Sequence, residues 1–173
     1  AVSRNIALQV ATFPKLIPGW FDTDKVEKML SNLVSNALKY TNAGGHVRVT
    51  VVLEREKAVI TVQDDGIGIS KEGQKQLYTR FFDGDYRKMH THGTGIGLSL
   101  TRDLVKLHHG EIACKSRLGE GTSFTIKLPI ARRFYAENEV EASPAKAYRG
   151  PSTVDVTGKT PPIEPSDDVD DKE

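Results

Sequence analysis

Cysteine and long apolar runs are both scarce in this 173-residue chain. Cys114 is the only cysteine, so an internal disulfide is impossible and we expect a reducing compartment such as the cytoplasm. No apolar run approaches the roughly 20 residues that a membrane-spanning helix needs. The first residues also lack the basic start and the apolar stretch of a secretion signal. We therefore expect the chain itself to be soluble.

Net charge is nearly absent as well: 24 lysines and arginines stand against 23 aspartates and glutamates. A protein built to cover nucleic acid needs many cationic side chains on one face, so this composition argues against that class. The charge is unevenly placed, because residues 1–130 carry 18 basic and 13 acidic side chains, and residues 131–173 carry 6 and 10. The mildly basic first part suits an anionic ligand, although solubility alone would also account for it.

Residues 131–173 differ from the rest in composition. They contain five of the eight prolines, few large apolar residues after Tyr135, and an acidic end. We predict a linker or tail that is largely disordered, apart from a first segment that packs on the domain. Residues 1–130 are then one globular domain, since this length suffices for a hydrophobic core.

Hydrophobic spacing predicts the elements of that domain. Ile6, Leu8 and Val10 alternate with polar or small residues, as in a half-buried strand. A helix capped by Asp22 or Thr23 follows, because apolar residues then recur at spacings of three and four. The other elements are strands over 47–53, 58–63, 111–116 and 122–128, a short helix over 70–78, and a helix over 95–109 closed by a left-handed Gly110. This order predicts a two-layer α/β sandwich, with a mixed, largely antiparallel sheet of about five strands and three helices.

Two asparagines stand on one face of the first long helix. Asn32 and Asn36 are four residues apart, and Lys39 and Tyr40 continue the same face one turn later. Carboxamide oxygens are hard, neutral ligands that suit Mg²⁺. The alternative is a solvent-facing helix with two ordinary asparagines.

An acidic residue and two glycines come directly after the third strand, in residues 64–69. A carboxylate at Asp64 can accept a hydrogen bond from the exocyclic amine of adenine, whereas guanine carries an oxygen there and would be repelled. Gly66 and Gly68 remove side chains that would block the base. A tight Asp-Gly turn without a ligand is the alternative.

A second glycine-rich stretch, residues 93–98, stands immediately before a helix. Backbone N–H groups at a helix N-terminus have no intrahelical partners and can face an anion, which favours phosphate binding. The alternative is a flexible hinge, and the two interpretations are compatible. The stretch is neither a Walker loop nor a dinucleotide-binding fingerprint.

The order of the three stretches, 32–41, 64–68 and 93–98, resembles the ATP-binding catalytic domain of sensor histidine kinases, in the wider group of gyrase, Hsp90 and MutL ATPases. This resemblance implies the Bergerat fold, bound ATP and Mg²⁺, and transfer of the γ-phosphate to a histidine on dimerisation and phosphoacceptor helices outside this chain. It also implies a response regulator or receiver domain as partner in two-component signal transduction, without nucleic acid or direct membrane contact. If the parent protein is a membrane receptor, its anchor lies outside this sequence.

The resemblance also assigns roles to single residues. Asn36 would hold the metal, Asn32 would lie close to it and to the phosphates, and Lys39 would neutralise phosphate charge, so that these three are the catalytic candidates. Thr122, in the stretch over residues 119–122 that resembles the family's last box, would help to bind near the Asp64 end through its hydroxyl, with an ordinary hairpin turn as the alternative. The nucleotide contacts that the resemblance implies are Asn32, Asn36, Lys39, Tyr40, Asp64, Gly66, Gly68, Ile69, Gly93, Thr94, Gly95, Ile96, Gly97, Leu98 and Thr122.

Residues 80–93 show no periodicity, and we interpret them as a mobile lid. Phe81 and Phe82 resemble the family's aromatic box, with core packing as the alternative. Family members often have an arginine after this pair, whereas this chain has Asp83. The candidates to replace that arginine are Arg80, Arg87 and Lys88.

Two other functions stay open at this point. ATPases of the gyrase, Hsp90 and MutL type have a glutamate at the position of Asn32, and an amide cannot accept a proton from water as that glutamate does. This favours a kinase over an ATP-hydrolysing switch. A module that binds nucleotide without turnover is the third possibility, because of Asp83. We interpret four histidines as neither metal ligands nor phosphoacceptors: His90, His92, His108 and His109.

Overall fold

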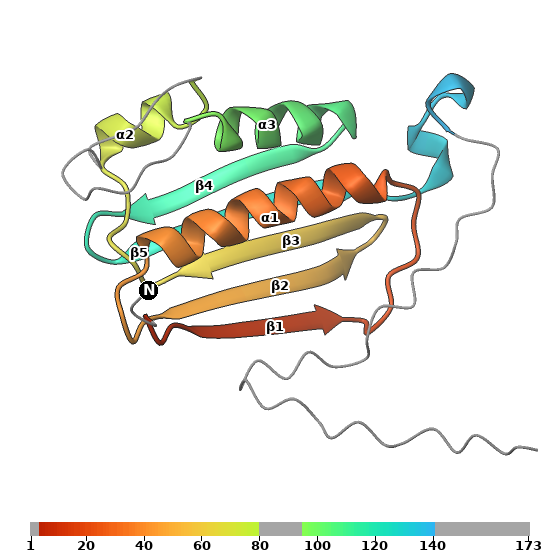
Figure 1. Ribbon diagram of the computed structural model, residues 1–173. Helices are drawn as coiled ribbons and strands as arrows, with labels where there is room; N and C mark the ends of the chain where they lie inside the picture. Colours follow the sequence, from red (N-terminus) through yellow and green to blue (C-terminus); the bar gives the residue numbers. More distant parts are fainter. Residues whose placement is uncertain (1–3, 80–94, 141–173) are drawn as a thin grey trace, which may run out of the picture. The chain divides into compact units, whose positions relative to one another are not determined.

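In the computed structural model, which describes residues 4–79 and 95–140, five strands pair into one sheet (Figure 1). The spatial order is β1-β2-β3-β5-β4. β1 and β2 are parallel, and the other three neighbouring pairs are antiparallel. The strands are β1 (Ala7–Phe13), β2 (His46–Glu54), β3 (Lys57–Asp64), β4 (Glu111–Arg117) and β5 (Gly121–Pro129).

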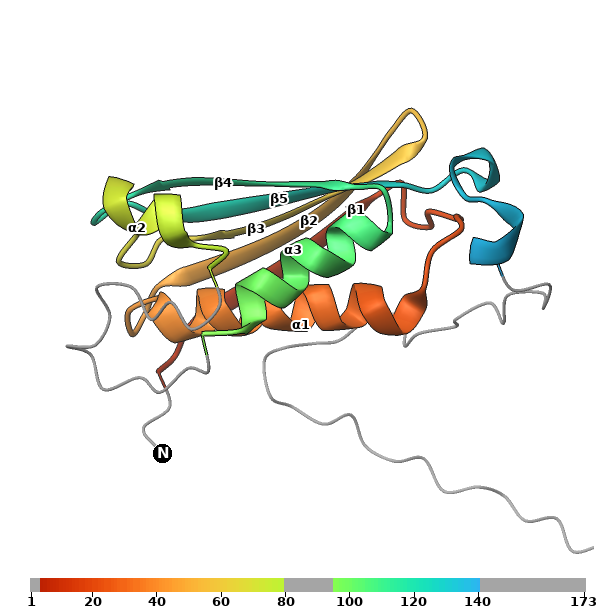
Figure 2. The same cartoon turned by 90° about the horizontal axis from the view of Figure 1, so that it is seen from above.

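Three α-helices lie on one face of this sheet, within the same described ranges, and Figure 2 shows the two layers edge on. They are α1 (Thr23–Tyr40), α2 (Lys71–Gln76) and α3 (Gly97–Leu107). Two short 3₁₀ turns, η2 (Arg132–Phe134) and η3 (Glu137–Glu139), follow the last strand. The predicted two-layer sandwich with a mixed, largely antiparallel sheet is therefore confirmed.

The hydrophobic core lies between the helices and the sheet. Leu33 of α1, Val47 of β2, Val105 of α3 and Ile126 of β5 have no exposed surface. Full burial of one such aliphatic side chain contributes about 1.5–3 kcal/mol to folding. These contacts hold α1 and α3 against the sheet and so fix where their polar faces lie.

Both ends of α1 are capped by side chains. The Asp22 carboxylate accepts a hydrogen bond from the Lys25 N–H at 3.0 Å, which identifies Asp22 as the N-cap. At the other end, the Arg4 guanidinium donates to the carbonyl oxygens of Lys39 and Thr41, at 2.9 and 2.6 Å. A cation at a helix C-terminus also interacts favourably with the helix dipole. The α1 C-terminus is therefore tied to the segment before β1.

The end of α3 differs from the prediction. His109, and not Gly110, has the left-handed backbone, with φ of 54°. A Cβ at Gly110 would lie only 2.7 Å from the carbonyl oxygen of Lys127 and 2.8 Å from a methyl group of Leu128. Close approach to β5, rather than backbone handedness, explains this glycine.

Some predictions concern residues outside the described ranges. The expected lid over 80–93 and the tail beyond residue 140 both lie there. In the ranges that are described, no helix has the length and apolar character needed to span a bilayer.

Candidate functional site

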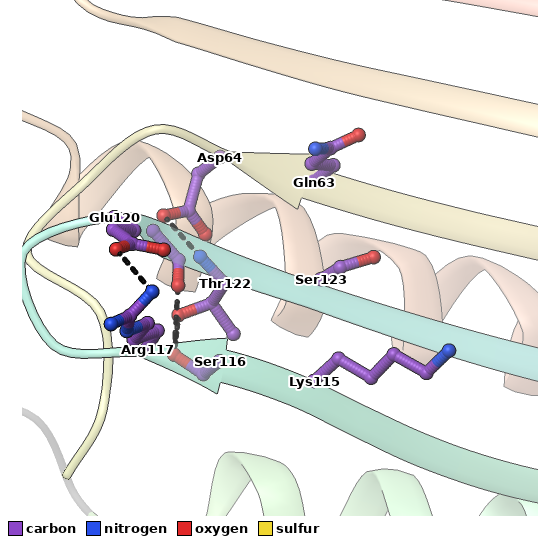
Figure 3. A pocket seen from close by; sticks show the side chains of 9 residues that line it. Gln63, Asp64, Lys115, Ser116, Arg117, Glu120, Thr122 and Ser123 are labelled. Atoms are coloured by element: carbon purple, nitrogen blue, oxygen red, sulfur yellow. Dashed lines mark hydrogen bonds and ion pairs between the residues drawn. The ribbon is translucent and has the colours of Figure 1, made fainter.

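A row of polar side chains crosses three neighbouring strands at one end of the sheet. Asp64, the last residue of β3, is the register partner of Thr122 in β5, and Thr122 is the register partner of Ser116 in β4. Figure 3 shows the three side chains lying next to one another. The sheet order therefore assembles a site from residues that are far apart in the sequence.

Asp64 is a buried residue, and only one of its two carboxylate oxygens has hydrogen-bond partners in the described part of the chain. The residue is only 8% exposed, and Oδ1 accepts hydrogen bonds from the N–H groups of Gly66 at 3.0 Å and Thr122 at 3.2 Å. Oδ2 has no hydrogen-bond partner within residues 4–79 and 95–140. Burial raises the pKa of this carboxyl, and the two N–H donors partly offset that effect. The free oxygen can accept a hydrogen bond from a ligand.

The turn after Asp64 is packed against two other parts of the fold. The Ile67 N–H donates to the Tyr40 carbonyl at the end of α1, at 3.1 Å, and the Ile67 carbonyl accepts from Gly119 N at 2.7 Å. A Cβ at Gly66 would overlap the Tyr40 carbonyl, and a Cβ at Gly68 would overlap the Arg117 carbonyl. The glycines of this turn are thus needed for close backbone packing, a reason that differs from the one we expected.

The two asparagines of α1 have different surroundings, although both are half-buried. The Asn32 amide nitrogen donates to the Gly97 carbonyl at 3.2 Å and to the Thr101 hydroxyl at 3.3 Å. Because a carbonyl can only accept, this contact leaves the Asn32 side-chain oxygen for another partner. The Asn36 side chain has no hydrogen-bond partner among the described residues. Two amide oxygens on α1 are therefore available to a ligand.

The third stretch begins α3 directly opposite Asn32. Gly95 has a left-handed backbone with φ of 63°, and no side chain caps the helix N-terminus at Ile96. Uncapped N–H groups at the start of an 11-residue helix favour an anion there. Gly93 and Thr94 lie outside the described residues.

Four other predicted contacts are placed as follows. The Lys39 ammonium lies 5.0 Å from the centre of the Tyr40 ring, so a cation and an aromatic face are paired at the end of α1. Ile69 is buried in the hydrophobic core, and Leu98 is partly buried and packs against the same core. Their roles toward a nucleotide stay predictions.

A pocket of about 320 Å³ opens at the Asp64 end of the sheet (Figure 3). Asp64 and Thr122 line it together with side chains of the sheet face that the helices leave uncovered. Its described lining includes no residue of α1 or α3. The pocket therefore covers only one end of the predicted site. Its lining residues are Gln63, Asp64, Lys115, Ser116, Arg117, Glu120, Gly121, Thr122 and Ser123.

Ser116 and Arg4 hold parts of the site in place without being predicted from the sequence. Ile112 and Cys114 face the core from alternate positions of β4, and Ser116 is the next position on that face. A polar residue at a position where the alternation predicts an apolar one is the signal that could have found Ser116. For Arg4 no local signal exists, since its partners lie at least 34 residues away.

The buried histidine of the fold is His108, which is 3% exposed. Its Nδ1 lies 2.8 Å from the Leu104 carbonyl, and its Nε2 accepts from the Asp22 N–H at 3.3 Å. Both ring nitrogens are thus engaged: Nδ1 contacts the last turn of α3, and Nε2 joins the end of α3 to the start of α1. The structure shows no cluster of three or more potential metal-binding His, Cys, Asp or Glu side chains within the described ranges.

Comparison with known proteins identifies the class to which this fold and site belong. Residues 21–132 match the family described as histidine kinase-, DNA gyrase B- and HSP90-like ATPase, and the chain belongs to this family. The sensor histidine kinase RppB of Synechocystis sp. is 37% identical over 131 residues, which are 75% of this chain and 29% of RppB.

Solved structures agree with this assignment. The nucleotide-free catalytic domain of the histidine kinase ThkA has a TM-score of 0.66 and 26% identity, covering 76% of this chain and 84% of that chain. Full-length ShkA in complex with AMPPNP has a TM-score of 0.63 and 25% identity, covering 74% of this chain and 26% of that chain. The fold is thus that of histidine kinase catalytic domains, although the chain spans less than a third of the length of its first curated relatives.

Proposed function

We propose that this chain binds Mg·ATP as the catalytic domain of a sensor histidine kinase and donates the γ-phosphate to a histidine on separate dimerisation and phosphoacceptor helices. The observation that carries this proposal is the buried Asp64 carboxylate, whose Oδ2 is unpartnered in the described part of the chain. A carboxylate oxygen that lines a pocket and has no protein partner in the described ranges can take a donor from a ligand, and the exocyclic amine of adenine supplies one.

The metal and the phosphates belong at the other end of the site. Asn36 would hold Mg²⁺ and Asn32 would lie near it, because amide oxygens fit an ion that takes few protein ligands. Lys39 and the N–H groups at the start of α3 would neutralise phosphate charge. Bound Mg²⁺ would supply electrostatic stabilisation of the transferring phosphoryl group.

The chain's own contribution to phosphoryl transfer is positioning. Such transfer needs the γ-phosphate in line with a nucleophile and little covalent help from protein. The nucleophile would come from the phosphoacceptor helices, and the phosphoryl group would pass on to a response regulator or receiver domain. RppB and its relatives carry the name of sensor kinases, and ShkA was solved with AMPPNP, which supports this assignment. We place the domain in the cytoplasm, where ATP is available.

An ATP-hydrolysing switch is the competing function, and the surroundings of Asn32 argue against it. The ATPases of the gyrase, Hsp90 and MutL type have a carboxylate as general base here, and in this chain a carboxylate would face the Gly97 carbonyl, an acceptor 3.2 Å from the present amide nitrogen. A kinase needs no base at this position. Supplying the phosphoacceptor helices should therefore yield phosphohistidine, whereas ATP binding without phosphohistidine would indicate a nucleotide-sensing module.

The proposal is tested by titrating the 173-residue chain with a non-hydrolysable ATP analogue, with and without Mg²⁺, by calorimetry. Asp64→Asn should weaken binding about 10- to 100-fold in both conditions, because it removes a charged hydrogen bond. Asn36→Asp should weaken binding mainly without Mg²⁺, since a bare carboxylate repels the phosphates and a metal-bound one does not.

Asp65→Asn is the matched control for the first variant. Asp65 is the next residue, but its side chain is 49% exposed and its oxygens contact His46. This change should leave the affinity within about twofold, as surface substitutions usually do. Failure of the native chain to bind the analogue, or full affinity in Asp64→Asn, would refute the proposed function.

A further inference from the structure

The Ser116 hydroxyl has three hydrogen-bond contacts at the end of the site that holds Asp64. It accepts from the Ile69 N–H at 2.8 Å and donates to the Gly121 carbonyl at 2.8 Å. Its third neighbour is the Thr122 hydroxyl, at 2.9 Å. No role in ligand binding was expected for this residue.

Counting protons fixes the direction of the contact between the two hydroxyls. A serine hydroxyl has one proton and two lone pairs. The Gly121 carbonyl can only accept, so it takes the Ser116 proton, and one Ser116 lone pair faces the Ile69 N–H. Thr122 must therefore donate its own proton to the remaining lone pair of Ser116.

This direction decides what Thr122 can offer to a ligand. With its proton held by Ser116, Thr122 Oγ1 presents only lone pairs on its other side. The nearby Asp64 carboxylate also presents an acceptor, since Oδ1 takes two backbone N–H groups and Oδ2 is unpartnered in the described ranges. This end of the site thus offers two acceptors. A ligand amine placed between these acceptors can donate to them, whereas a ligand carbonyl in the same place is repelled by both.

We propose that Ser116 is a positioning residue that sets the base specificity of the site, by holding the Thr122 hydroxyl in its accepting orientation. The inference rests on the proposed function, because the ligand that it discriminates is the base of a nucleoside triphosphate. Without Ser116, the Thr122 proton has no partner among residues 4–79 and 95–140 and can turn toward a ligand carbonyl. Discrimination between amine and carbonyl then weakens, even if binding of the phosphates is unchanged.

The test compares Mg·ATP with Mg·ITP, whose hypoxanthine base has a carbonyl in place of the adenine amine. The measured quantity is the ratio of the two dissociation constants, Kd(ITP)/Kd(ATP), for the 173-residue chain. Ser116→Ala should lower this ratio about 3- to 10-fold, the size of one hydrogen bond's preference. Ser116→Thr keeps the hydroxyl on a residue type that strands favour, and it should keep the native ratio.

A second substitution separates specificity from structural support. Thr122→Val removes the hydroxyl and keeps the shape, so Ser116→Ala added to Thr122→Val should not change the ratio further. A role of Ser116 in holding the Ile69 turn alone would instead weaken ATP and ITP equally, in either background. If Ser116→Ala does not fold by circular dichroism, Ser116→Cys is measured, because sulfur is only a weak acceptor for the Thr122 proton and should shift the ratio in the same direction.

An unchanged ratio in a folded Ser116→Ala or Ser116→Cys variant would overturn the inference, and so would an equal loss for both nucleotides. In either case a native chain that binds ATP more tightly than ITP leaves the proposed function standing. A native chain that binds neither nucleotide would overturn both proposals.

Discussion

The ionised Asp64 carboxylate favours binding of an adenine amine in the proposed function, but it lowers the stability of the fold. Burial raises its pKa above the usual value of 3.8, although the N–H groups of Gly66 and Thr122 act in the opposite direction. A carboxyl with a raised pKa stabilises the fold below its unfolded pKa, and this contribution is lost as the pH rises through the folded pKa. The ionised carboxylate that an adenine amine would need is therefore unfavourable for folding at neutral pH.

We expect Asp64→Asn to raise the Tm of the nucleotide-free chain at pH 7. The amide oxygen can still accept from Gly66 and Thr122, and the buried charge is removed. A rise of about 2–4 °C corresponds to about 1 kcal/mol in a domain of this size. Thermal unfolding followed from pH 7 to pH 4 should show the gap closing as the pH approaches 3.8.

Asp65→Asn should change the Tm in the opposite direction in the same assay. Hydrogen bonds from the His46 backbone and side chain lower the pKa of the exposed Asp65. Its contribution to stability is therefore present above the unfolded pKa and lost as the pH falls through the folded pKa. The variant should lower the Tm at pH 7. A Tm difference for Asp64→Asn that does not depend on pH would contradict this account of the buried charge.

At the scale of elements, the turn over residues 65–69 joins the end of α1 to the β4–β5 hairpin. Hydrogen bonds run from this turn to Tyr40 on one side and Gly119 on the other. Gly68 has φ of 68°, and any Cβ there would overlap the Arg117 carbonyl. Backbone conformation and space both require a glycine at this position.

Gly68→Ala should destabilise the domain by at least about 3 kcal/mol, because a left-handed alanine and an overlap with backbone add together. Gly119→Ala is the matched control: its φ is 81°, and nothing lies within 4 Å of the added Cβ. That change should cost about 1 kcal/mol, the conformational penalty alone. Urea unfolding of both variants measures the difference in their free energies of unfolding. Equal destabilisation would show that the β4–β5 hairpin moves away from the Cβ added at Gly68 without a cost in free energy.

The elements themselves were largely predictable, with one informative exception. The Asp22 cap and the apolar spacing of α1 act within a few residues, so the sequence predicts them directly. Gly110 was wrongly interpreted as a left-handed helix terminator, because its true constraint is β5. Because β5 begins more than ten residues after Gly110, the sequence around Gly110 contains no pattern that predicts this contact.

At the scale of the whole molecule, the compact unit extends beyond the last strand into residues 131–140. The Tyr135 hydroxyl donates to the Pro129 carbonyl at 2.7 Å, and Arg133 forms an ion pair with Glu56. The Arg132 guanidinium lies 5.6 Å from the centre of the Trp20 ring. Residues 131–140 therefore contact the domain, and we propose that they contribute to its stability.

A chain that ends at Val140 should unfold at the same temperature as the full chain, to within about 1 °C. A chain that ends at Ile130 should have a Tm lower by at least about 4 °C, because it loses the Tyr135, Arg133 and Arg132 contacts. Calorimetry of the three chains measures this directly. Equal Tm values for all of them would support a domain end at residue 130, as composition predicts.

The sequence by itself determined the element order, the two-layer class and the three stretches that we propose as the nucleotide site, because spacing, capping and glycine content are local properties of a chain. Only the tertiary structure decided which oxygen of Asp64 is free, which way the Asn32 amide faces, and that Ser116 completes the row across the sheet. Several of these contacts join residues 47 to 69 positions apart. The contacts of Asp64, Thr122 and Ser116 depend on β5 lying between β3 and β4, and the Asn32 contact depends on α1 packing beside α3; no local pattern encodes either neighbourhood.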